Sequence, residues 1–434
     1  PNNRQRAPRF LLLRSLAVAT LLAAGQVAPA RLFGQDTESQ STKTQSATSQ
    51  QFWDGSSLED WDGDPKYWST KEGALVGEIP LGTTLNHNTW LVLKDQTVSD
   101  FELRLQFKLT GAPAANSGIQ FRCQVDSVDH VSGYQADLDM GATWLGRIYD
   151  EHGRALLVER GSRVHILPDG KRKTKTFSAA GDYEVFFREN DWNDYRIVAV
   201  GQRVDVFVNG TLFSQLWDEQ IGQTDLEGSL AFQLHSGPET KIQFRNILLN
   251  TIAGQQSALL PWKAIEPETE VVVDGKFPQS KEGKPLNLGF ESGDLQDWTA
   301  VGNAFKDQPI KSDGISRRWP GQSSGKQGNY FIGGYEVVHD GGIGTLTSAP
   351  FAVNQPFASF LFAGGQNPST RIELLEWKDG QPGDVFYTAS GIDQEQMSRA
   401  VVDLTQRQGQ SIAIRLVDEN AGAWGHLNFD DFRF

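Results

Sequence analysis

The sequence predicts an all-β protein that contains two β-sandwich (jelly-roll) domains. Short runs of alternating apolar and polar residues, punctuated by Gly, Asn and Asp, fill residues 52–251 and return in residues 286–434. No long segment repeats its apolar residues at helical spacing. Between the two regions, residues 252–285 accumulate Pro, Glu and Lys around one short apolar run, which predicts a linker. The length of 434 residues fits this division, because a domain usually takes about 100–200 residues.

The composition excludes several classes of function. The chain has 40 Lys and Arg against 54 Asp and Glu, a net charge of −14, without a long basic cluster, so nucleic acid is not an expected partner. The single cysteine, Cys123, excludes an intramolecular disulfide and a multi-cysteine zinc site, so any metal needs oxygen or nitrogen ligands. Phosphate-loop, serine-hydrolase and HExxH motifs do not occur. These observations favour a neutral ligand.

The first 51 residues have the pattern of an export signal followed by a tether. Arg4, Arg6 and Arg9 precede a short apolar run, and Ala28-Pro29-Ala30 supplies the small residues of a cleavage site. We therefore expect a signal peptide over residues 1–30 and a periplasmic or secreted bacterial protein. The apolar run of about 11 residues is shorter than the roughly 20 that span a bilayer, so no membrane insertion is expected after cleavage. Residues 31–51 are expected to form a disordered tether, because almost all of them are small or polar.

The polar faces of the expected strands carry chemistry that suits sugars. Successive strand residues point to opposite faces, so residues 119–125 divide into an apolar and a polar set, with Cys123 in the core beside Ile119 and Phe121. The polar sets of residues 119–125, 133–139, 229–235 and 241–247 contain amides, arginines, carboxylates and a histidine. If they share one sheet, its surface can bind hydroxyls and move protons. For each strand alone, a merely solvated face is the alternative.

Nine short motifs in residues 52–247 occur in the order that the 3-keto-disaccharide hydrolase domain family has them, and over about 200 residues the chain resembles this family. The resemblance implies a concanavalin-like jelly roll in an exported enzyme that cleaves glycosides whose glucose unit carries a ketone at C3. The family usually has Glu and Gln where this chain has Gln135 and Asp137, so the carboxylate lies one pleat further along the same face. The motifs are Phe52-Trp53-Asp54-Gly55, Leu58-Glu59-Asp60-Trp61, Trp68 with Glu72-Gly73-Ala74-Leu75, Ser99-Asp100-Phe101-Glu102-Leu103-Arg104, Asn116-Ser117-Gly118-Ile119, Gly133-Tyr134, Asp191-Trp192-Asn193, Val208-Asn209-Gly210 and Gln243-Phe244-Arg245-Asn246-Ile247.

This resemblance directs a mechanistic hypothesis. A ketone at C3 acidifies the C2 hydrogen, so the glycosidic bond can be cleaved by proton abstraction at C2, loss of the C1 substituent and addition of water. We expect Asp137 as the base, His235 as the acid or proton shuttle, and Arg122 with Gln120 at the enolate oxygen. Glu151 is the alternative carboxylate. The other expected substrate contacts are Gln135, Asn116, Tyr149, Gln233, Trp144, Trp192 and Arg245.

Two pairs of carboxylates are candidates for a divalent metal such as calcium, and no other cofactor is expected. Asp137 and Asp139 lie about 6.5 Å apart along one strand face, so both can contact an ion, with a solvated acidic strand end as the alternative. In the second domain, Glu291 and Asp430 belong to its first and last strands and are candidates for a structural calcium, with ordinary turn chemistry as the alternative.

The second domain looks like the β-sandwich modules appended to secreted carbohydrate-active enzymes, on motifs such as residues 290–295 and 424–432. This looser resemblance implies an accessory, carbohydrate-binding role. Two functions follow for the whole chain: a 3-keto-glycoside hydrolase or lyase, or a non-catalytic carbohydrate-binding or surface-attached protein. A cleft that gathers Asp137, His235 and Arg122 favours the enzyme, whereas a flat face with outward aromatic side chains favours binding. A conventional glycosidase needs two carboxylates about 5–9.5 Å apart and is a third alternative.

Overall fold

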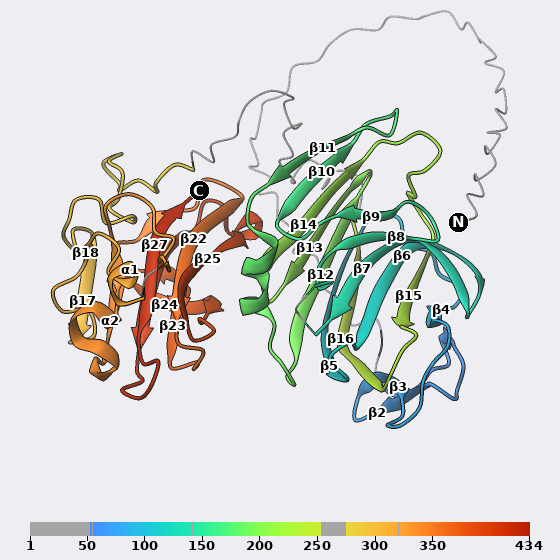
Figure 1. Cartoon of the computed structure of the whole chain (residues 1–434). Helices are drawn as coiled ribbons and strands as arrows, with labels where there is room; N and C mark the ends of the chain where they lie inside the picture. Colours follow the sequence, from blue (N-terminus) through green and yellow to red (C-terminus); the bar gives the residue numbers. More distant parts are fainter. Residues whose placement is uncertain (1–52, 54, 141–142, 253–274, 320) are drawn as a thin grey trace, which may run out of the picture. The chain divides into compact units, whose positions relative to one another are not determined.

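The computed structural model describes residues 53, 55–140, 143–252, 275–319 and 321–434 (Figure 1). The described residues form 27 strands and a few short helical turns, which confirms the all-β prediction. The expected signal peptide (1–30) and tether (31–51) lie outside the described residues, as do residues 253–274 of the expected linker. Among the described residues, the helices are too short and too polar to cross a membrane.

The first domain consists of two layers of strands. One layer is a seven-stranded sheet that positions the candidate site. Its order is β1 (Trp61–Asp62), β4 (Thr89–Leu93), β15 (Ser229–Leu234), β6 (Asn116–Ser127), β7 (His130–Asp139), β8 (Ile148–Glu151) and β9 (Ala155–Val158), and every neighbouring pair is antiparallel.

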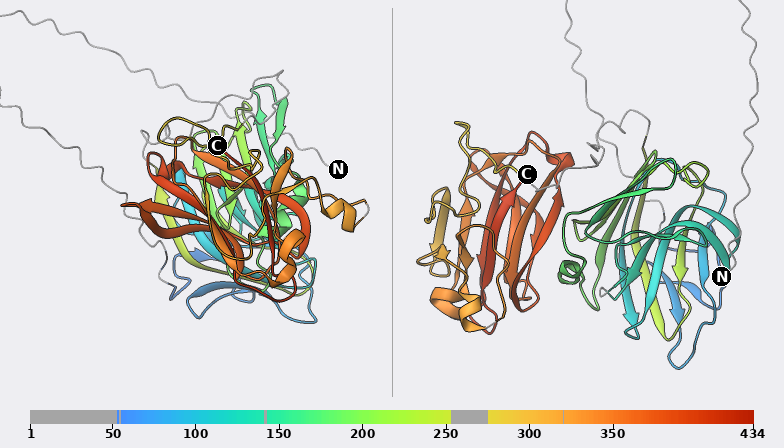
Figure 2. Two further views of the ribbon diagram at one scale, coloured as in Figure 1. Left: turned by 90° about the vertical axis from the view of Figure 1, so that its left-hand side faces the viewer. Right: turned by 45° about the horizontal axis from the view of Figure 1, so that its top comes forward.

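The second layer of this domain has the order β14 (Thr211–Asp218), β13 (Arg203–Val208), β12 (Asn193–Val200), β5 (Phe101–Gly111), β16 (Thr240–Thr251), β3 (Ala74–Ile79) and β2 (Trp68–Lys71). At the β14 end, β10 (Ser162–Ile166) pairs parallel with β14, and β11 (Arg172–Thr176) pairs with β10. The 3-10 helix η1 (Ala180–Phe186) precedes β12. Figure 2 shows the two layers from two further sides.

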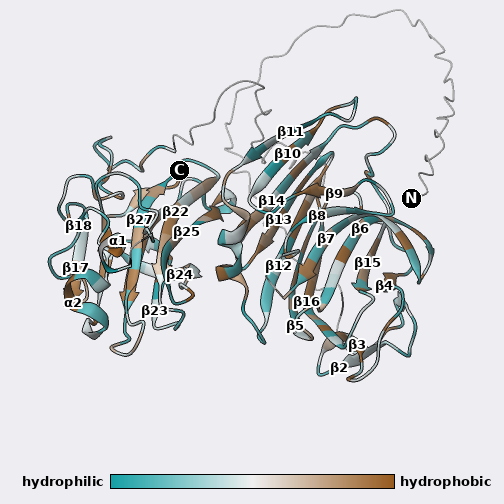
Figure 3. Ribbon diagram, in the orientation of Figure 1, coloured by the Kyte–Doolittle hydropathy of each residue, from teal (hydrophilic) through white to brown (hydrophobic). Residues whose placement is uncertain are grey.

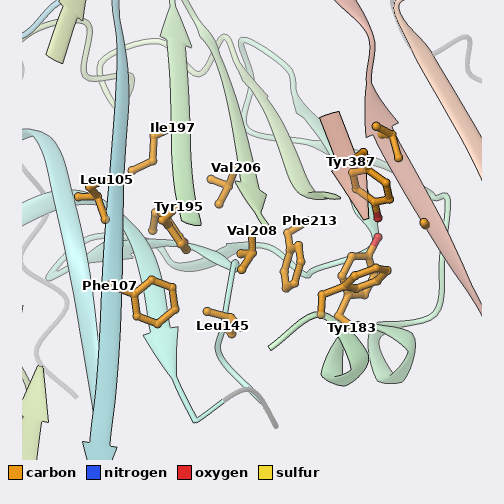
Figure 4. Close-up of a cluster of buried hydrophobic side chains, with 14 of the residues drawn as sticks. Leu105, Phe107, Leu145, Tyr183, Tyr195, Ile197, Val206, Val208, Phe213 and Tyr387 are labelled. Carbon is orange, nitrogen blue, oxygen red and sulfur yellow. The ribbon is translucent and has the colours of Figure 1, made fainter. Parts of the chain in front are cut away.

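The core of the first domain lies between these layers, because alternation along each strand turns one apolar face inward. Along β5 every second residue is buried, from Phe101 to Leu109, as the sequence predicts. Figure 4 shows part of this core, where Leu105 and Phe107 of β5 lie beside Tyr195 and Ile197 of β12. Hydropathy alternates along the strands in Figure 3. Each large apolar side chain buried in this way stabilises the fold by about 1.5–3 kcal/mol.

One irregularity in β6 reverses the predicted alternation. Arg122 has a positive φ of 52°, and the pairing with β15 and with β7 shifts at this point, so Arg122 is the extra residue of a β-bulge. Cys123 is buried as predicted, but it packs with Trp90, Val92 and Ala231 in a small cluster apart from the main core. Burial raises the pKa of its thiol to about 12, which fits an inert side chain.

The second domain is another sandwich, which confirms the predicted architecture. One sheet has the order β18 (Ile310–Lys311), β19 (Tyr330–Gly333), β27 (Leu427–Arg433), β22 (Phe357–Gly364) and β25 (Gln394–Asp403). The other has the order β17 (Trp298–Gly302), β20 (Gly344–Ser348), β26 (Ser411–Asp418), β23 (Thr370–Lys378) and β24 (Gln381–Ala389), with β21 (Phe351–Ala352) also paired to β26. The short helices are α1 (Ile315–Arg318), α2 (Tyr335–Val338), η3 (His339–Gly341) and η4 (Thr405–Arg407).

Ordered structure of the second domain begins before the expected boundary at residue 286. Lys276 and Phe434 exchange two backbone hydrogen bonds, and Gln279 forms a bridge with Pro285. Residues 275–285 therefore pack with the second sandwich, although the sequence predicts them as part of the linker. The Pro and Lys content of this segment resembles a linker, although its backbone is paired.

Candidate active site

A cleft of about 540 Å³ opens on the polar face of the seven-stranded sheet. Strands β7 and β8 supply its floor, His235 follows β15, and the segments before β6 and after β7 supply its rim. Seven predicted catalytic or substrate-binding residues line it: Asn116, Gln135, Asp137, Trp144, Tyr149, Glu151 and His235. The remaining lining residues are Pro113, Ala114, Ala115, Asp139, Met140 and Thr143. These side chains, which the sequence predicts near one sheet surface, therefore lie together in the folded domain.

Antiparallel register explains this convergence. Gln135 lies opposite Tyr149, and Gly133 opposite Glu151, so alternate residues of β7 and β8 share one face. On the other side of β7, Asp137 lies opposite Gly118 of β6. Because Gly118 has no side chain, the space beside Asp137 stays open for a neighbouring group.

Gln135 fills the space above Gly118. A Cβ atom on Gly118 would lie 2.5 Å from Cδ of Gln135, which shows how closely the amide side chain covers this glycine. From there Nε2 of Gln135 donates a hydrogen bond of 2.8 Å to Oδ1 of Asp137. Gln135 thus orients the carboxyl group that is the candidate base.

The Asp137 carboxyl group is buried, with only 3% of the residue exposed. Burial raises the pKa of Asp137 well above its ordinary value, although the hydrogen bond from Gln135 acts in the opposite direction. Oδ2 is buried without a hydrogen-bond partner. The ionised form of a carboxyl group with a raised pKa is a stronger base than an exposed carboxylate, so Asp137 suits proton abstraction once it has lost its own proton.

Glu151 and His235 form a second proton-active pair in the cleft. Burial raises the pKa of Glu151, and the charge of nearby His235 partly opposes this shift. Nδ1 of His235 lies 2.6 Å from the carbonyl oxygen of Ser236, so it donates this hydrogen bond and leaves Nε2 for another partner. Tyr149 also lines the cleft, and burial raises the pKa of its phenol, which keeps it a hydrogen-bond donor.

Trp144 provides an aromatic surface at the rim, with 38% of the residue exposed. The guanidinium carbon of Arg147 lies 4.5 Å from its ring centroid, and Tyr149 approaches it edge-on with centroids 6.2 Å apart. Arg147 is in turn fixed by two hydrogen bonds to Glu159. A supported, exposed indole is the usual surface for stacking of a sugar ring.

Residues 48–250 match the model of a family described as the 3-keto-alpha-glucoside-1,2-lyase-like domain. The first domain is therefore similar to this lyase-like domain, over a little less than half of the chain. The resemblance seen in its nine motifs is therefore confirmed.

Similar proteins include two that are provisionally named glycosyl hydrolases. An Aspergillus rugulosus protein, provisionally named glycosyl hydrolase ecdE, is 26% identical over 169 residues, or 38% of this chain, and the match spans only 23% of that protein. A provisionally assigned glycosyl hydrolase structure from Parabacteroides distasonis has 19% identity and a TM-score of 0.31, covering 46% of this chain and 97% of that one. A carbohydrate binding module, CBM66, from Bacillus subtilis has 14% identity and a TM-score of 0.30, covering 44% and 96%.

Arg122 does not line the cleft, so its expected role at an enolate oxygen is wrong. The bulge turns its side chain away from the polar face, and it donates hydrogen bonds to the carbonyl oxygens of Ser99 and Gly201 and to the Asp100 carboxylate. The guanidinium group therefore ties β6 to the turns at the ends of β5 and β12. A positive φ at a residue other than glycine has no signature in the alternation of polar and apolar residues, so the bulge could not be predicted from the sequence.

Four other predicted substrate contacts lie outside the cleft lining. Arg245 belongs to β16 of the second layer, where its guanidinium carbon lies 3.9 Å from the ring centroid of Trp192, the residue directly before β12. Gln120 and Gln233 lie in the seven-stranded sheet as predicted, but both are completely buried. The loop residues 113–115 were missed by sequence reasoning, because Pro and Ala carry no chemical signal; only their place directly before Asn116 marks them.

The carboxylates do not fit the expected metal sites. Asp139 accepts hydrogen bonds from the backbone N–H groups of Thr143, Trp144 and Leu145, so its two oxygens hold the rim loop. In the second domain, Glu291 accepts from the backbone of Asn329 and Tyr330. Among the described residues, no group of three or more His, Cys, Asp or Glu side chains is arranged to hold a metal ion.

Asp430, the other predicted calcium ligand of the second domain, is buried and bonded to the backbone. Burial raises the pKa of Asp430 to about 8, so the carboxyl group is largely protonated at neutral pH. Its Oδ2 accepts a hydrogen bond from the backbone N–H of Gln327. Among the described residues, Asp430 belongs to no group of three or more His, Cys, Asp or Glu side chains that could hold an ion, so the predicted structural calcium is not supported.

Proposed function

We propose that the lyase-like domain cleaves the glycosidic bond of 3-keto-glycosides. The single observation that carries the proposal is the buried Asp137 carboxyl group in a cleft, oriented by Gln135 and with a raised pKa. The family match supports the same substrate class. A C2 hydrogen beside a C3 ketone is acidic enough for such a base, whereas an unoxidised sugar has no comparable proton.

Each step uses a group that lines the cleft. Asp137 takes the C2 proton, and the electron pair forms the enolate, toward which Tyr149 and Asn116 donate hydrogen bonds. The C1–O bond then breaks, and the leaving oxygen receives a proton from the Glu151–His235 pair. Water finally adds across the C1–C2 double bond, which gives hydrolysis overall. Trp144 stacks on a sugar ring of the substrate.

The proposal also includes a place of action. The basic N-terminal segment, short apolar run and Ala28-Pro29-Ala30 pattern support export to the periplasm or the medium. The net charge of −14 suits a protein whose ligand is neutral.

The test compares turnover of 3-keto-trehalose and unoxidised trehalose by the full chain. We expect cleavage of the keto sugar only, and a reduction of kcat by at least about 100-fold in Asp137→Asn, because general-base catalysis contributes about 10²–10⁴-fold. Asp129→Asn, at an exposed position of the hairpin before β7, is the matched control. A chelator should leave turnover unchanged, because the oxygens of Asp139 serve the backbone.

Equal cleavage of both sugars would instead indicate a conventional glycosidase. Absence of cleavage, together with binding to a glycan panel, would overturn the enzymatic assignment for these substrates. The domain would then act as a carbohydrate-binding module that uses the same cleft.

A further inference from the structure

A row of buried amide groups lies beside the cleft and is not explained by the chemistry above. Gln120 and Gln233 are completely buried, and both amide atoms of each lack a hydrogen-bond partner. Oε1 of Gln135 and Nε1 of Trp90 are also buried without a partner. Such atoms are rare in folded proteins, because each loses its hydrogen bonds to bulk water. We call the amides of Gln233, Gln120 and Gln135, together with the indole N–H of Trp90, the amide row.

Register places the amide row across four neighbouring strands. Trp90 of β4 lies opposite Gln233 of β15, which lies opposite Gly118 of β6, which lies opposite Asp137 of β7. In the next row along the strands, Gln120 lies opposite Gln135. Adjacent strands are about 4.8 Å apart, so Gly118 separates Gln233 from Asp137 by two strand spacings, or roughly 10 Å.

The side chain of Gln135 lies within this interval. Its amide covers Gly118, where it comes within 2.8 Å of the site of a Cβ atom, and its Nε2 donates to Asp137. Its Oε1 stays without a partner. Polar atoms therefore continue from Trp90 to the candidate base, along one face of one sheet.

We propose that the amide row binds internal water, and that this water is the molecule added to the unsaturated sugar in the last step of the reaction. The inference rests on the proposed function. Amides offer both donors and acceptors, and a buried water molecule makes about three hydrogen bonds to polar groups that otherwise lack partners. A water held at Gln135 reaches the sugar from the side of Asp137 and does not have to enter past the bound substrate.

The hydration step balances as follows. After elimination, Asp137 holds the proton taken from C2, and the Glu151–His235 pair has given a proton to the leaving oxygen. The water oxygen bonds to C1 and its proton returns to the Glu151–His235 pair, while Asp137 returns its proton to C2. Both catalytic groups regain their starting states, and one water is consumed per bond cleaved.

The test replaces the amides by an apolar side chain of similar shape, in Gln120→Met, Gln233→Met and the double variant. With 3-keto-trehalose, we expect the ratio of unsaturated to hydrated sugar, measured by NMR in single turnover, to rise at least about tenfold in the double variant. The thermal midpoint should change little, because the amides are lost together with the waters bonded to them, and no buried polar group is left without its partner. Gln243→Met, at a half-buried position of β16 in the second layer, should change neither quantity.

A crystal structure of the full chain tests water binding separately from activity. Ordered waters bonded to Gln120, Gln233 and Gln135 in the wild type, and lost in the double variant, would support the inference. Amides bonded directly to one another without water would overturn it, and so would an unchanged product ratio. If the wild type does not cleave the keto sugar, the proposed function fails and the role in hydration fails with it, whereas ordered waters would still show binding.

Discussion

At the scale of single residues, Gly118 controls the position of the candidate base. It leaves space for the amide of Gln135, which in turn orients Asp137. Arg122, four residues further along the same strand, has a different task, because its guanidinium group joins the sheet to Ser99 and Gly201. Within β6, Gly118 therefore serves the chemistry of the cleft, whereas Arg122 serves the stability of the fold.

Gly118→Ala tests this arrangement. The added Cβ would lie 2.5 Å from Cδ of Gln135, closer than real contacts allow, so the amide must move away from Asp137. We expect kcat to fall about tenfold and the free energy of unfolding to fall by about 1–3 kcal/mol, as for other overpacked sites. Loss of the hydrogen bond removes an influence that lowers the pKa of Asp137, so the acid limb of the pH–rate profile should move to higher pH. Gly181→Ala, where a Cβ meets no atom within 4 Å, is the control.

At the scale of elements, alternation predicted the site on β7 and failed on β6. Gln135 and Asp137 lie two residues apart in a regular strand, so spacing alone placed them on one face. Tyr149 and Glu151 join this face through the pairing of β8 with β7, which alternation along one strand does not reveal. The bulge at Arg122 inserts a residue and exchanges the faces that follow it. A bulge depends on pairing with two neighbouring strands, which a single strand's pattern does not contain. The burial of Gln120 and Gln233 was also missed, because burial depends on which groups pack over a sheet face, and the pattern of one strand does not contain this information.

The rim loop after β7 also depends on contacts that the sequence pattern does not reveal. Asp139 was predicted as a metal ligand, but it gathers three backbone N–H groups and so presents Trp144 to the cleft. Asp139→Asn retains one carbonyl oxygen for these donors. We expect a loss of about 1–3 kcal/mol in stability, since buried donors lose a charged partner, and a KM for the keto sugar raised several-fold with a smaller change in kcat. Kinetics and indole fluorescence would measure both effects, and an unchanged KM would contradict the role of this loop.

At the scale of the whole molecule, several buried carboxyl groups together determine how the stability of the fold changes with pH. Burial raises the pKa of Asp205 and of Asp418 to about 7 and that of Asp430 to about 8, and it also raises the pKa of Asp137. These residues occur in both domains. In an unfolded chain an aspartate titrates near about 3.9, so between pH 4 and about 8 the folded state binds more protons than the unfolded state.

The free energy of unfolding should therefore fall as pH rises through this window, because stability decreases with pH wherever the native state holds the extra protons. The net charge of −14 acts in the same direction, through repulsion that grows as carboxyl groups ionise. We expect the thermal midpoint at pH 8 to lie at least about 4 °C below that at pH 5, since about 1 kcal/mol shifts the midpoint of a domain of this size by roughly 2–4 °C. Asp205→Asn and Asp430→Asn should each flatten the dependence, whereas exposed Asp129→Asn should not. A midpoint that rises steadily from pH 5 to pH 8 would show that ionised, paired carboxylates dominate the stability of this protein, and that these four buried groups do not.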